Sequence, residues 1–278
     1  AQRLRKLLVV SEIALSLVLL VCAGLLIRSY QRILSSHPGF DPRDVVAMRI
    51  ALPQVKAPTP EAISSFYQRV TDRLRALPGV EAAGVSYSLP MSTVAFAWDP
   101  VTIEGYVPRT PDEKIMANIR IISPDYFRAM GMTLLQGRTV AESDTLESPR
   151  VAVLSESLAK RCFPNQDPIG KRIYHGRLNP GQVGELDRWT NVSLWTEVVG
   201  VVSDVKSLNL DPKVEPNVYV PYWQWPMQSP TLALQATGNP ANLAAAVYSE
   251  VKAVNKNLPL PKVQTMNERL SDIVAEPR

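Results

Sequence analysis

The stretch TPEAISSFYQRVTDRLRALPGVEAAGVSYSLP, residues 59–90, predicts a helix followed directly by a strand. Thr59 is suited to cap the helix because its hydroxyl can accept a backbone N–H, and Pro60 suits the first helical turn. Pro78 and Gly79 would end the helix before the strand begins. Apolar side chains recur at helical spacing along it: Ile63, Phe66, Tyr67, Val70, Leu74 and Leu77.

Two strand–helix–strand units bracket the chain. The segment VVAMRIALP, residues 45–53, predicts a strand before the helix, so the first unit covers 45–90. Near the other end, a strand at 231–237 and a helix after Pro240 precede a short strand at 261–265. Two such units usually form one sheet with both helices on one face. The predicted fold class is therefore α+β, with a split βαβ lobe built from residues 41–92 and 228–266.

The middle of the chain, residues 93–227, has a different character and is predicted to be an inserted, mixed α/β lobe. Residues 122–140 suggest a short helix and a strand, and residues 150–173 suggest a strand, a helix and a second strand. The valine-rich segment 196–207 is typical of a buried strand. The segment EPNVYVPYWQWP, residues 215–226, is expected to be an aromatic edge strand with proline at its ends.

The N-terminal stretch LLVVSEIALSLVLLVCAGLLI, residues 7–27, is expected to cross a membrane. As a helix it would be about 31 Å long, which matches a hydrocarbon core of about 30 Å. A cleaved signal peptide, a lipoprotein signal ending at Cys22 and a buried soluble helix are the alternatives. Helical spacing continues to about Leu34, so residues 1–40 are predicted to form a transmembrane helix with a stalk. The flanking basic residues favour a cytoplasmic N-terminus.

The charge distribution argues against nucleic acid as a partner. The net charge of the first 32 residues is +4, which equals the net charge of the whole chain. The remainder is therefore neutral and has no basic footprint for DNA or RNA. The charged residues of that N-terminal segment are Arg3, Arg5, Lys6, Glu12, Arg28 and Arg32.

No catalytic, cofactor-binding or metal-binding residues are predicted. The chain has two cysteines and two histidines, which leaves little for a zinc site or a histidine-based triad. The segment PIGKRI, residues 168–173, fails as a phosphate-binding loop because Asn165 and Arg172 stand where glycine and Ser or Thr are required. The sequence therefore indicates a protein that is not an enzyme.

Three residues are candidates for coupling or for an interface. Trp223 and Trp225 alternate with Gln224, so on a strand both would point to one face. That face would be a platform for a ligand or partner, or would pack between the lobes. Glu12 lies near the N-terminal end of the apolar stretch. It would either reach the membrane interface or contact a neighbouring span or a coupling subunit.

Several segments, in the same order, resemble MacB/FtsX-type ABC transporter permeases, and most closely the second half of duplicated orphan permeases of the acidobacterial type. Residues 174–191 and 222–228 resemble them least. The segments that carry the resemblance are LLVVSEIALSLVLLVCAGLLIRSYQRI, HPGFDPRDVVAMRIALP, ISPDYFRAMGMTLLQGR, VAVLSESLAKRCFPNQDPIGKRI, VVGVVSDVKSLNLDPKVEPNVYVPY and TMNERLSDIVAEPR.

The resemblance implies a MacB-like periplasmic core domain, in which a porter-like lobe from both chain ends carries the inserted lobe. Residues 267–278 would then lead to a second transmembrane span that this sequence lacks. ATP would be bound by a separate subunit or domain, and its hydrolysis would drive export or mechanotransmission. The implied partners are membrane lipid, an ABC ATPase subunit, and other permease helices or a second permease half. The implied location is the bacterial inner membrane, with residues after about 35 in the periplasm.

A different class of function also fits the sequence. A bitopic extracytoplasmic sensor or solute-binding module would have the same membrane helix and external domain. It would need a ligand pocket between the two lobes, which the permease interpretation does not require.

Overall fold

The structure is a computed structural model, and it forms two compact units, Ala1–Pro38 and Gly39–Arg278. The residues that it describes are 2, 12–25, 28, 39–50, 59–90, 97–106, 114–176, 195–205, 214–225, 230–237, 243–258 and 263–269.

In the first unit, residues 12–25 are helical, and the large apolar side chains of this helix are exposed. Among the described residues, no helix is both long enough and apolar enough to cross a membrane. The span predicted at 7–27 and its stalk to Leu34 extend over residues outside the described set, so both stay predictions.

In the second unit, four antiparallel strands from the two chain ends lie together, in the order β11-β1-β10-β2. Their bounds are β1 (Val45–Arg49), β2 (Val80–Ser86), β10 (Thr231–Ala236) and β11 (Gln264–Thr265). Strand β10, from the far end of the sequence, lies between β1 and β2. Segments of the chain that are some 150 residues apart in sequence therefore share one part of the sheet.

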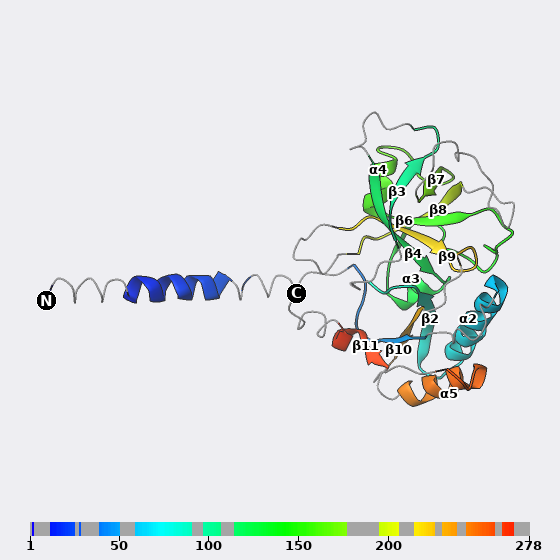
Figure 1. Ribbon diagram of the computed structural model, residues 1–278, viewed down its shortest axis with the longest axis horizontal. Helices are drawn as coiled ribbons and strands as arrows, with labels where there is room; N and C mark the ends of the chain where they lie inside the picture. Colours follow the sequence, from blue (N-terminus) through cyan, green and yellow to red (C-terminus); the bar gives the residue numbers. More distant parts are fainter. Residues whose placement is uncertain are drawn as a thin grey trace. The chain divides into compact units, whose positions relative to one another are not determined.

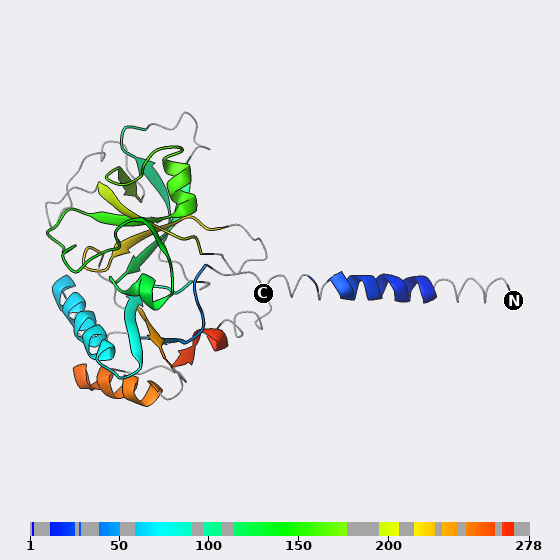
Figure 2. The same ribbon diagram turned by 180° about the vertical axis from the view of Figure 1, so that it is seen from behind.

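Helices α2 (Pro60–Arg75) and α5 (Ala244–Val254) lie side by side, as Figures 1 and 2 show. Both contribute to one apolar cluster with β1, β2 and β10, so both cover the same face of the sheet. The predicted cap of α2 is confirmed, because the Thr59 hydroxyl accepts a hydrogen bond from the backbone N–H of Ala62 at 3.3 Å. Arg73 of α2 also forms an ion pair with Glu250 of α5 at 2.9 Å.

The middle of the chain closes six strands into a ring. Neighbours in the ring are β3–β4, β4–β9, β9–β6, β6–β8, β8–β7 and β7–β3, with β4–β9 and β6–β8 parallel. The short strand β5 pairs with β8 outside this ring. The bounds are β3 (Ala97–Ile103), β4 (Ile115–Ile122), β5 (Leu134–Gly137), β6 (Val151–Ser155), β7 (Arg172–His175), β8 (Thr196–Val202) and β9 (Asn217–Pro221).

One alternate set of side chains from all six strands belongs to a single apolar cluster, so this set fills the inside of the closed sheet. Helix α4 (Glu156–Cys162) contributes to the same cluster. Members of the set are Val101, Ile119, Leu154, Ile173, Val198, Val201, Val218 and Val220. The predicted mixed α/β character is confirmed, whereas the strand predicted at 215–226 ends at Pro221 and continues as a turn.

The two sets of strands are joined through helix α3 (Tyr126–Ala129) more than through the sheet. Among the described residues, the register of β2 and β4 has one pair, Ser86 with Ile122, and a backbone hydrogen bond lies on either side of it. Helix α3 packs so closely on β2 that a Cβ on Gly84 would lie 2.6 Å from the Tyr126 Cα. Because residues 39–278 form one compact unit, the predicted lobe boundaries at 93 and 227 stay predictions.

Candidate functional site

The second unit begins with a backbone contact that leaves no room for a side chain. Gly39 has φ +85°, and a Cβ there would lie 1.9 Å from the carbonyl oxygen of Asp204. The next residue, Phe40, is fully buried in an apolar cluster that also contains Val205. The start of the unit is therefore locked onto the end of β8 by backbone contact and by an aromatic anchor.

The same segment also contacts the end of α3. The backbone N–H of Asp41 donates to the Met130 carbonyl at 3.0 Å. Gly131 has φ +61°, and a Cβ there would lie 2.9 Å from the Asp41 Cβ. We call Gly39–Asp41 together with Met130–Gly131 and Asp204–Val205 the docking corner. It brings the start of the unit against both α3 and β8.

The docking corner extends to α4 through the Asp204 carboxylate. One oxygen of this carboxylate accepts hydrogen bonds from the backbone N–H of Ser157 at 3.0 Å and from the Ser157 hydroxyl at 2.7 Å. Ser157 lies in the first turn of α4, where backbone N–H groups lack partners within the helix. Asp204 thus has a structural role, and it connects the docking corner with the ring of strands.

A buried arginine strengthens the junction between the two sets of strands. Arg120 of β4 donates from Nε to the Asn217 side-chain oxygen at 2.6 Å. From Nη1 it also contacts the Ser88 hydroxyl at 3.2 Å and the carbonyls of Ser88 and Leu89 at 3.4 Å. It therefore connects β4 and β9 with the segment that follows β2. We did not predict this role, and the available signal was a single basic residue within the apolar strand IMANIRII.

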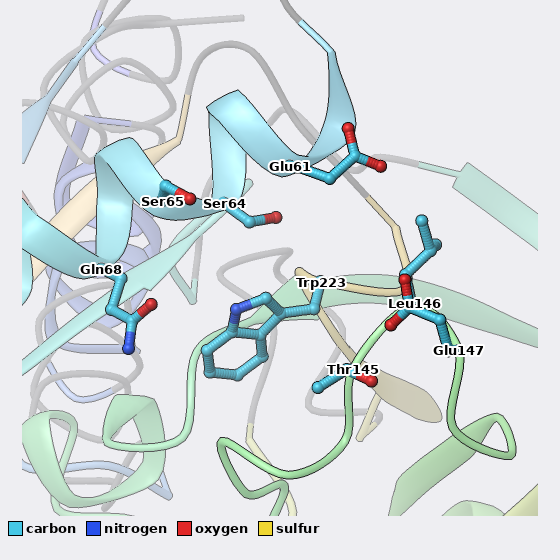
Figure 3. Close-up of a pocket in the computed structure, with 8 residues that line it drawn as sticks. All are labelled: Glu61, Ser64, Ser65, Gln68, Thr145, Leu146, Glu147 and Trp223. Atoms are coloured by element: carbon cyan, nitrogen blue, oxygen red, sulfur yellow. The ribbon is translucent and has the colours of Figure 1, made fainter.

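Trp223 lies in the turn after β9 and lines a groove of about 150 Å³ between α2 and the segment 145–147 (Figure 3). Its indole is stacked on the Tyr222 ring, with centroids 4.1 Å apart and an interplanar angle of 28°. We call this the Trp223 groove. Its other lining residues are Glu61, Ser64, Ser65, Gln68, Thr145, Leu146 and Glu147.

The wall of the Trp223 groove that residues 145–147 form is held by buried polar contacts. The buried Asp144 carboxylate binds the Arg138 guanidinium through two hydrogen bonds of 2.9 Å, and it accepts the Ala141 N–H at 2.7 Å. The buried Gln224 side chain donates to the carbonyls of Thr145 at 3.2 Å and Pro149 at 3.0 Å. The groove is therefore preformed.

Trp225 has different surroundings from Trp223. Its ring centroid lies 4.9 Å from that of His175, and the Arg150 Cζ lies 4.9 Å from the indole centroid. The expectation that both tryptophans share one strand face is wrong, because residues 222–225 form a turn in which side chains do not alternate as in a strand. The predicted role of either tryptophan in an interface stays a prediction.

Glu12 is exposed on the helix of the first unit. Its predicted contact with a neighbouring span or a coupling subunit stays a prediction. Among the described residues, no group of three or more His, Cys, Asp or Glu side chains is arranged to hold a metal ion. The expectation that the chain has no catalytic or cofactor-binding residues also stays a prediction.

His175 should make the stability of the protein dependent on pH. Burial, with a smaller effect of the Arg150 charge, lowers the pKa of His175 to about 4. The unfolded chain takes up this proton near pH 6.5 and the folded chain near pH 4, so stability is lost as the pH falls through that window. We expect a loss of about 2 kcal/mol by pH 5 and of about 3 kcal/mol by pH 4.

Urea unfolding of the full chain between pH 7 and pH 5 tests this expectation. His175→Gln cannot titrate at this position. Between pH 7 and pH 5 the wild type should therefore lose about 2 kcal/mol more of its free energy of unfolding than the variant does. Parallel pH profiles for the two proteins would show that His175 is not buried in its neutral form.

Comparison with known proteins places this architecture in a family. The sequence profile of the MacB-like periplasmic core domain matches residues 8–254. The macrolide export ATP-binding/permease protein MacB of Aggregatibacter actinomycetemcomitans is 35% identical over 106 residues, which are 38% of this chain and 14% of that protein. MacB of Mannheimia succiniciproducens is 41% identical over 56 residues, which are 20% of this chain and 9% of that protein. The chain thus matches a small share of the length of these relatives.

A solved structure supports the same assignment at the level of the fold. The periplasmic region of MacB from Actinobacillus actinomycetemcomitans has a TM-score of 0.51 and 17% sequence identity, and the match covers 89% of this chain and 100% of that one. At this identity the likeness shows the fold alone. Since the family profile covers most of the sequence, the chain belongs to the MacB-like periplasmic core domain family, the external domain of MacB/FtsX-type ABC transporter permeases.

Proposed function

We propose that residues 39–278 are a rigid external body that an N-terminal membrane helix moves when an ABC ATPase hydrolyses ATP. The observation that carries this proposal is the docking corner, where Gly39 lies so close to Asp204 that no side chain fits. A displacement of the chain immediately before Gly39 would therefore be passed to the body directly. Motion of this kind, in which a packed unit moves as a whole, is a common form of conformational coupling.

The junction between the two sets of strands supports the rigidity of this body. Helix α3 contacts β2 so closely that a Cβ on Gly84 would collide with the backbone of Tyr126. Arg120 adds buried hydrogen bonds that connect β4, β9 and the segment after β2. The docking corner includes the end of α3, so force applied at Gly39 would reach the element that joins the two sets of strands.

The remaining parts of the proposal follow from the family. We expect ATP to be bound by a separate subunit or domain. We expect the body to lie outside the cytoplasm of a bacterial cell, on the inner membrane. The partners would be membrane lipid, the ATPase, and other permease helices or a second permease half. The names of the MacB relatives describe macrolide export, and export is the activity we propose for the complete transporter, with the substrate left open.

The alternative of a sensor or solute-binding module depends on a ligand pocket between the two sets of strands. The described cavity in that position, the Trp223 groove, measures about 150 Å³. Pockets that enclose a whole small molecule typically measure about 300–1,000 Å³. The groove is thus suited to a single functional group rather than to a complete metabolite, so this groove does not support the sensor alternative.

A flexible insertion tests the proposal. Gly-Ser-Gly-Ser placed immediately before Gly39 should uncouple the body from the helix in the complete transporter, because the docking corner would no longer receive the displacement. One spin label is placed at Lys252→Cys on α5 and a second on the ATPase. In the parent protein we expect ATP to change the distance between the two labels. In the protein with the insertion we expect this distance to stay the same. The parent and all variants carry Cys22→Ser.

The same insertion after Gly105 is the matched control. Gly105 also has positive φ, but no heavy atom lies within 4 Å of the position of its Cβ, so this insertion should leave the ATP-driven change intact. Coupling that survives the insertion before Gly39 would contradict the proposal.

A further inference from the structure

The ring of six strands has a cavity at one of its mouths. The end of β3, the start of β4, the end of α4 and the residue before β7 line this cavity, which measures about 390 Å³. Pockets that enclose a whole small molecule typically measure about 300–1,000 Å³, and the mouths of β-barrels are a common place for them. We call this the mouth cavity, and its lining includes Ile103, Ile115, Arg161, Cys162, Phe163 and Lys171.

Part of the mouth cavity is an apolar surface that continues the core of the ring. Cys162 and Phe163 are buried and belong to the apolar cluster that fills the ring, and Ile103 and Ile115 pack against this cluster. Burial raises the pKa of Cys162 to about 12, although the charge of Arg161 has an opposing and smaller effect. Such a shift is typical of a group with little access to water. This apolar surface is suited to the hydrocarbon part of a ligand.

Two cationic side chains line the same cavity without a carboxylate partner. Neither Arg161 nor Lys171 forms an ion pair with a described residue. Their neighbours in the sequence differ in this respect, because Lys160 is paired with a glutamate of its own helix and Arg172 donates two hydrogen bonds to the Glu104 carboxylate. Glu104 also lines the cavity, but Arg172 compensates its charge. The mouth cavity therefore has uncompensated positive charge next to an apolar surface.

These two features together select one class of ligand. A guanidinium group binds a carboxylate through paired hydrogen bonds of matching geometry, and a nearby ammonium group adds a second positive charge. An inorganic anion would leave the apolar surface unused, and an uncharged hydrocarbon would leave both cations without a partner. A molecule that carries a carboxylate on an apolar body uses both features.

We propose that the mouth cavity binds a small organic acid, whose carboxylate contacts Arg161 and Lys171 and whose apolar body contacts Ile103, Ile115 and Phe163. The volume of about 390 Å³ is sufficient for a whole small molecule. The cavity belongs to the ring of six strands and to α4, so it is not a pocket between the two sets of strands. The proposal is also separate from the coupling function, because it does not depend on the docking corner.

Titration calorimetry of the full chain in detergent micelles tests the proposal with 3-phenylpropionate, after subtraction of the heat of titration into empty micelles. Two further ligands separate the two features of the cavity. 3-Phenylpropanamide keeps the apolar body and lacks the charge, whereas acetate keeps the charge and lacks the apolar body. We expect saturable binding of 3-phenylpropionate, and binding that is weaker by about tenfold or more for each of the other two.

A pair of double variants assigns the binding to the mouth cavity. Arg161→Gln/Lys171→Gln should weaken the binding of 3-phenylpropionate about tenfold or more, and it should keep the wild-type melting temperature because both side chains are exposed. Lys252→Gln/Lys256→Gln removes two exposed positive charges that do not line the cavity, so this matched control should bind like wild type. Absence of saturable binding, equal affinity for the amide or for acetate, or unchanged affinity of Arg161→Gln/Lys171→Gln would overturn the proposal.

A peptide distinguishes a free acid from the C-terminus of another polypeptide. Acetyl-Gly-Gly-Phe presents the same aromatic ring and a free carboxylate at the end of a peptide chain. We expect 3-phenylpropionate to bind at least as tightly as this peptide, because the cavity is sufficient for a small molecule alone. Tighter binding of the peptide would contradict the assignment of a small acid. All these outcomes are independent of whether the insertion before Gly39 uncouples the body.

Discussion

Gly39→Ala should lower the free energy of unfolding of the full chain by about 2–5 kcal/mol. An L-residue at positive φ costs about 1–2 kcal/mol, and overpacking against a fixed neighbour adds about 1–3 kcal/mol. Here the neighbour is the backbone carbonyl of Asp204, only 1.9 Å from the position of the new Cβ. The carbonyl cannot move away as a side chain would, because it is part of the backbone just after β8, between the Asp204 side chain bonded to Ser157 and the buried Val205. Urea unfolding followed by far-ultraviolet circular dichroism measures the loss.

Gly105→Ala isolates the steric part of this effect. Gly105 has φ +76°, but no heavy atom lies within 4 Å of the position of its Cβ. The variant should therefore pay only the backbone cost, about 1–2 kcal/mol. If Gly39→Ala and Gly105→Ala lost the same stability, close backbone contact would not be what holds the docking corner together.

Arg120→Met should also have a large effect and lower the free energy of unfolding by about 3 kcal/mol. Methionine keeps much of the apolar volume but removes every hydrogen bond of the guanidinium. The Asn217 side-chain oxygen and the Ser88 hydroxyl, both in buried residues, would lose this donor. Each buried polar group that is left without a partner costs about 1–3 kcal/mol. The loss would fall on the junction between the two sets of strands.

Arg73→Met is the control for Arg120→Met. The Arg73 side chain is 51% exposed and, within the described part of the chain, pairs with Glu250 at 2.9 Å, so its loss should cost less than about 1 kcal/mol. Urea unfolding of the two variants compares a buried with an exposed arginine in the same chain. If the two variants lost the same free energy of unfolding relative to wild type, the Arg120 hydrogen bonds would not be what holds the junction.

Helix α2 shows what the sequence predicts well. Its start depends on Thr59 and Pro60, and its buried face depends on apolar residues spaced along one helix. These signals are local, so they can be identified without knowing the fold. The same holds for α5 and for the mixed α/β character, and the resemblance to MacB/FtsX-type permeases indicates the family from the sequence alone.

The closed ring of six strands could not be predicted in this way. It depends on the parallel pairing of β4 with β9, in which Ile119 lies opposite Val218 across almost 100 residues of sequence. No local pattern encodes such a partner. The docking corner has the same origin, because the glycine at position 39 is explained by the carbonyl of Asp204, which follows a strand that is distant in sequence.

The tryptophan pair shows how a wrong local assignment misleads a site prediction. Alternation of Trp223 and Trp225 implies a common face only on a strand, and the strand ends at Pro221. The residue between them, Gln224, is the buried one, and its amide holds the segment that lines the Trp223 groove. Residues of α2 and of the segment 145–147 meet at this groove only in the folded chain.

The central claim is that residues 39–278 move as one body, and the distance between its two ends tests it most directly. Spin labels at Lys252→Cys on α5 and Trp98→Cys on β3, in a Cys22→Ser background, report on the two sets of strands, while the buried Cys162 is retained. In the complete transporter, double electron–electron resonance should give the same distance distribution between these labels with and without ATP. The distance from Lys252 to the ATPase should change in the same samples. A shift of the distance between Lys252 and Trp98 on ATP binding would contradict the account.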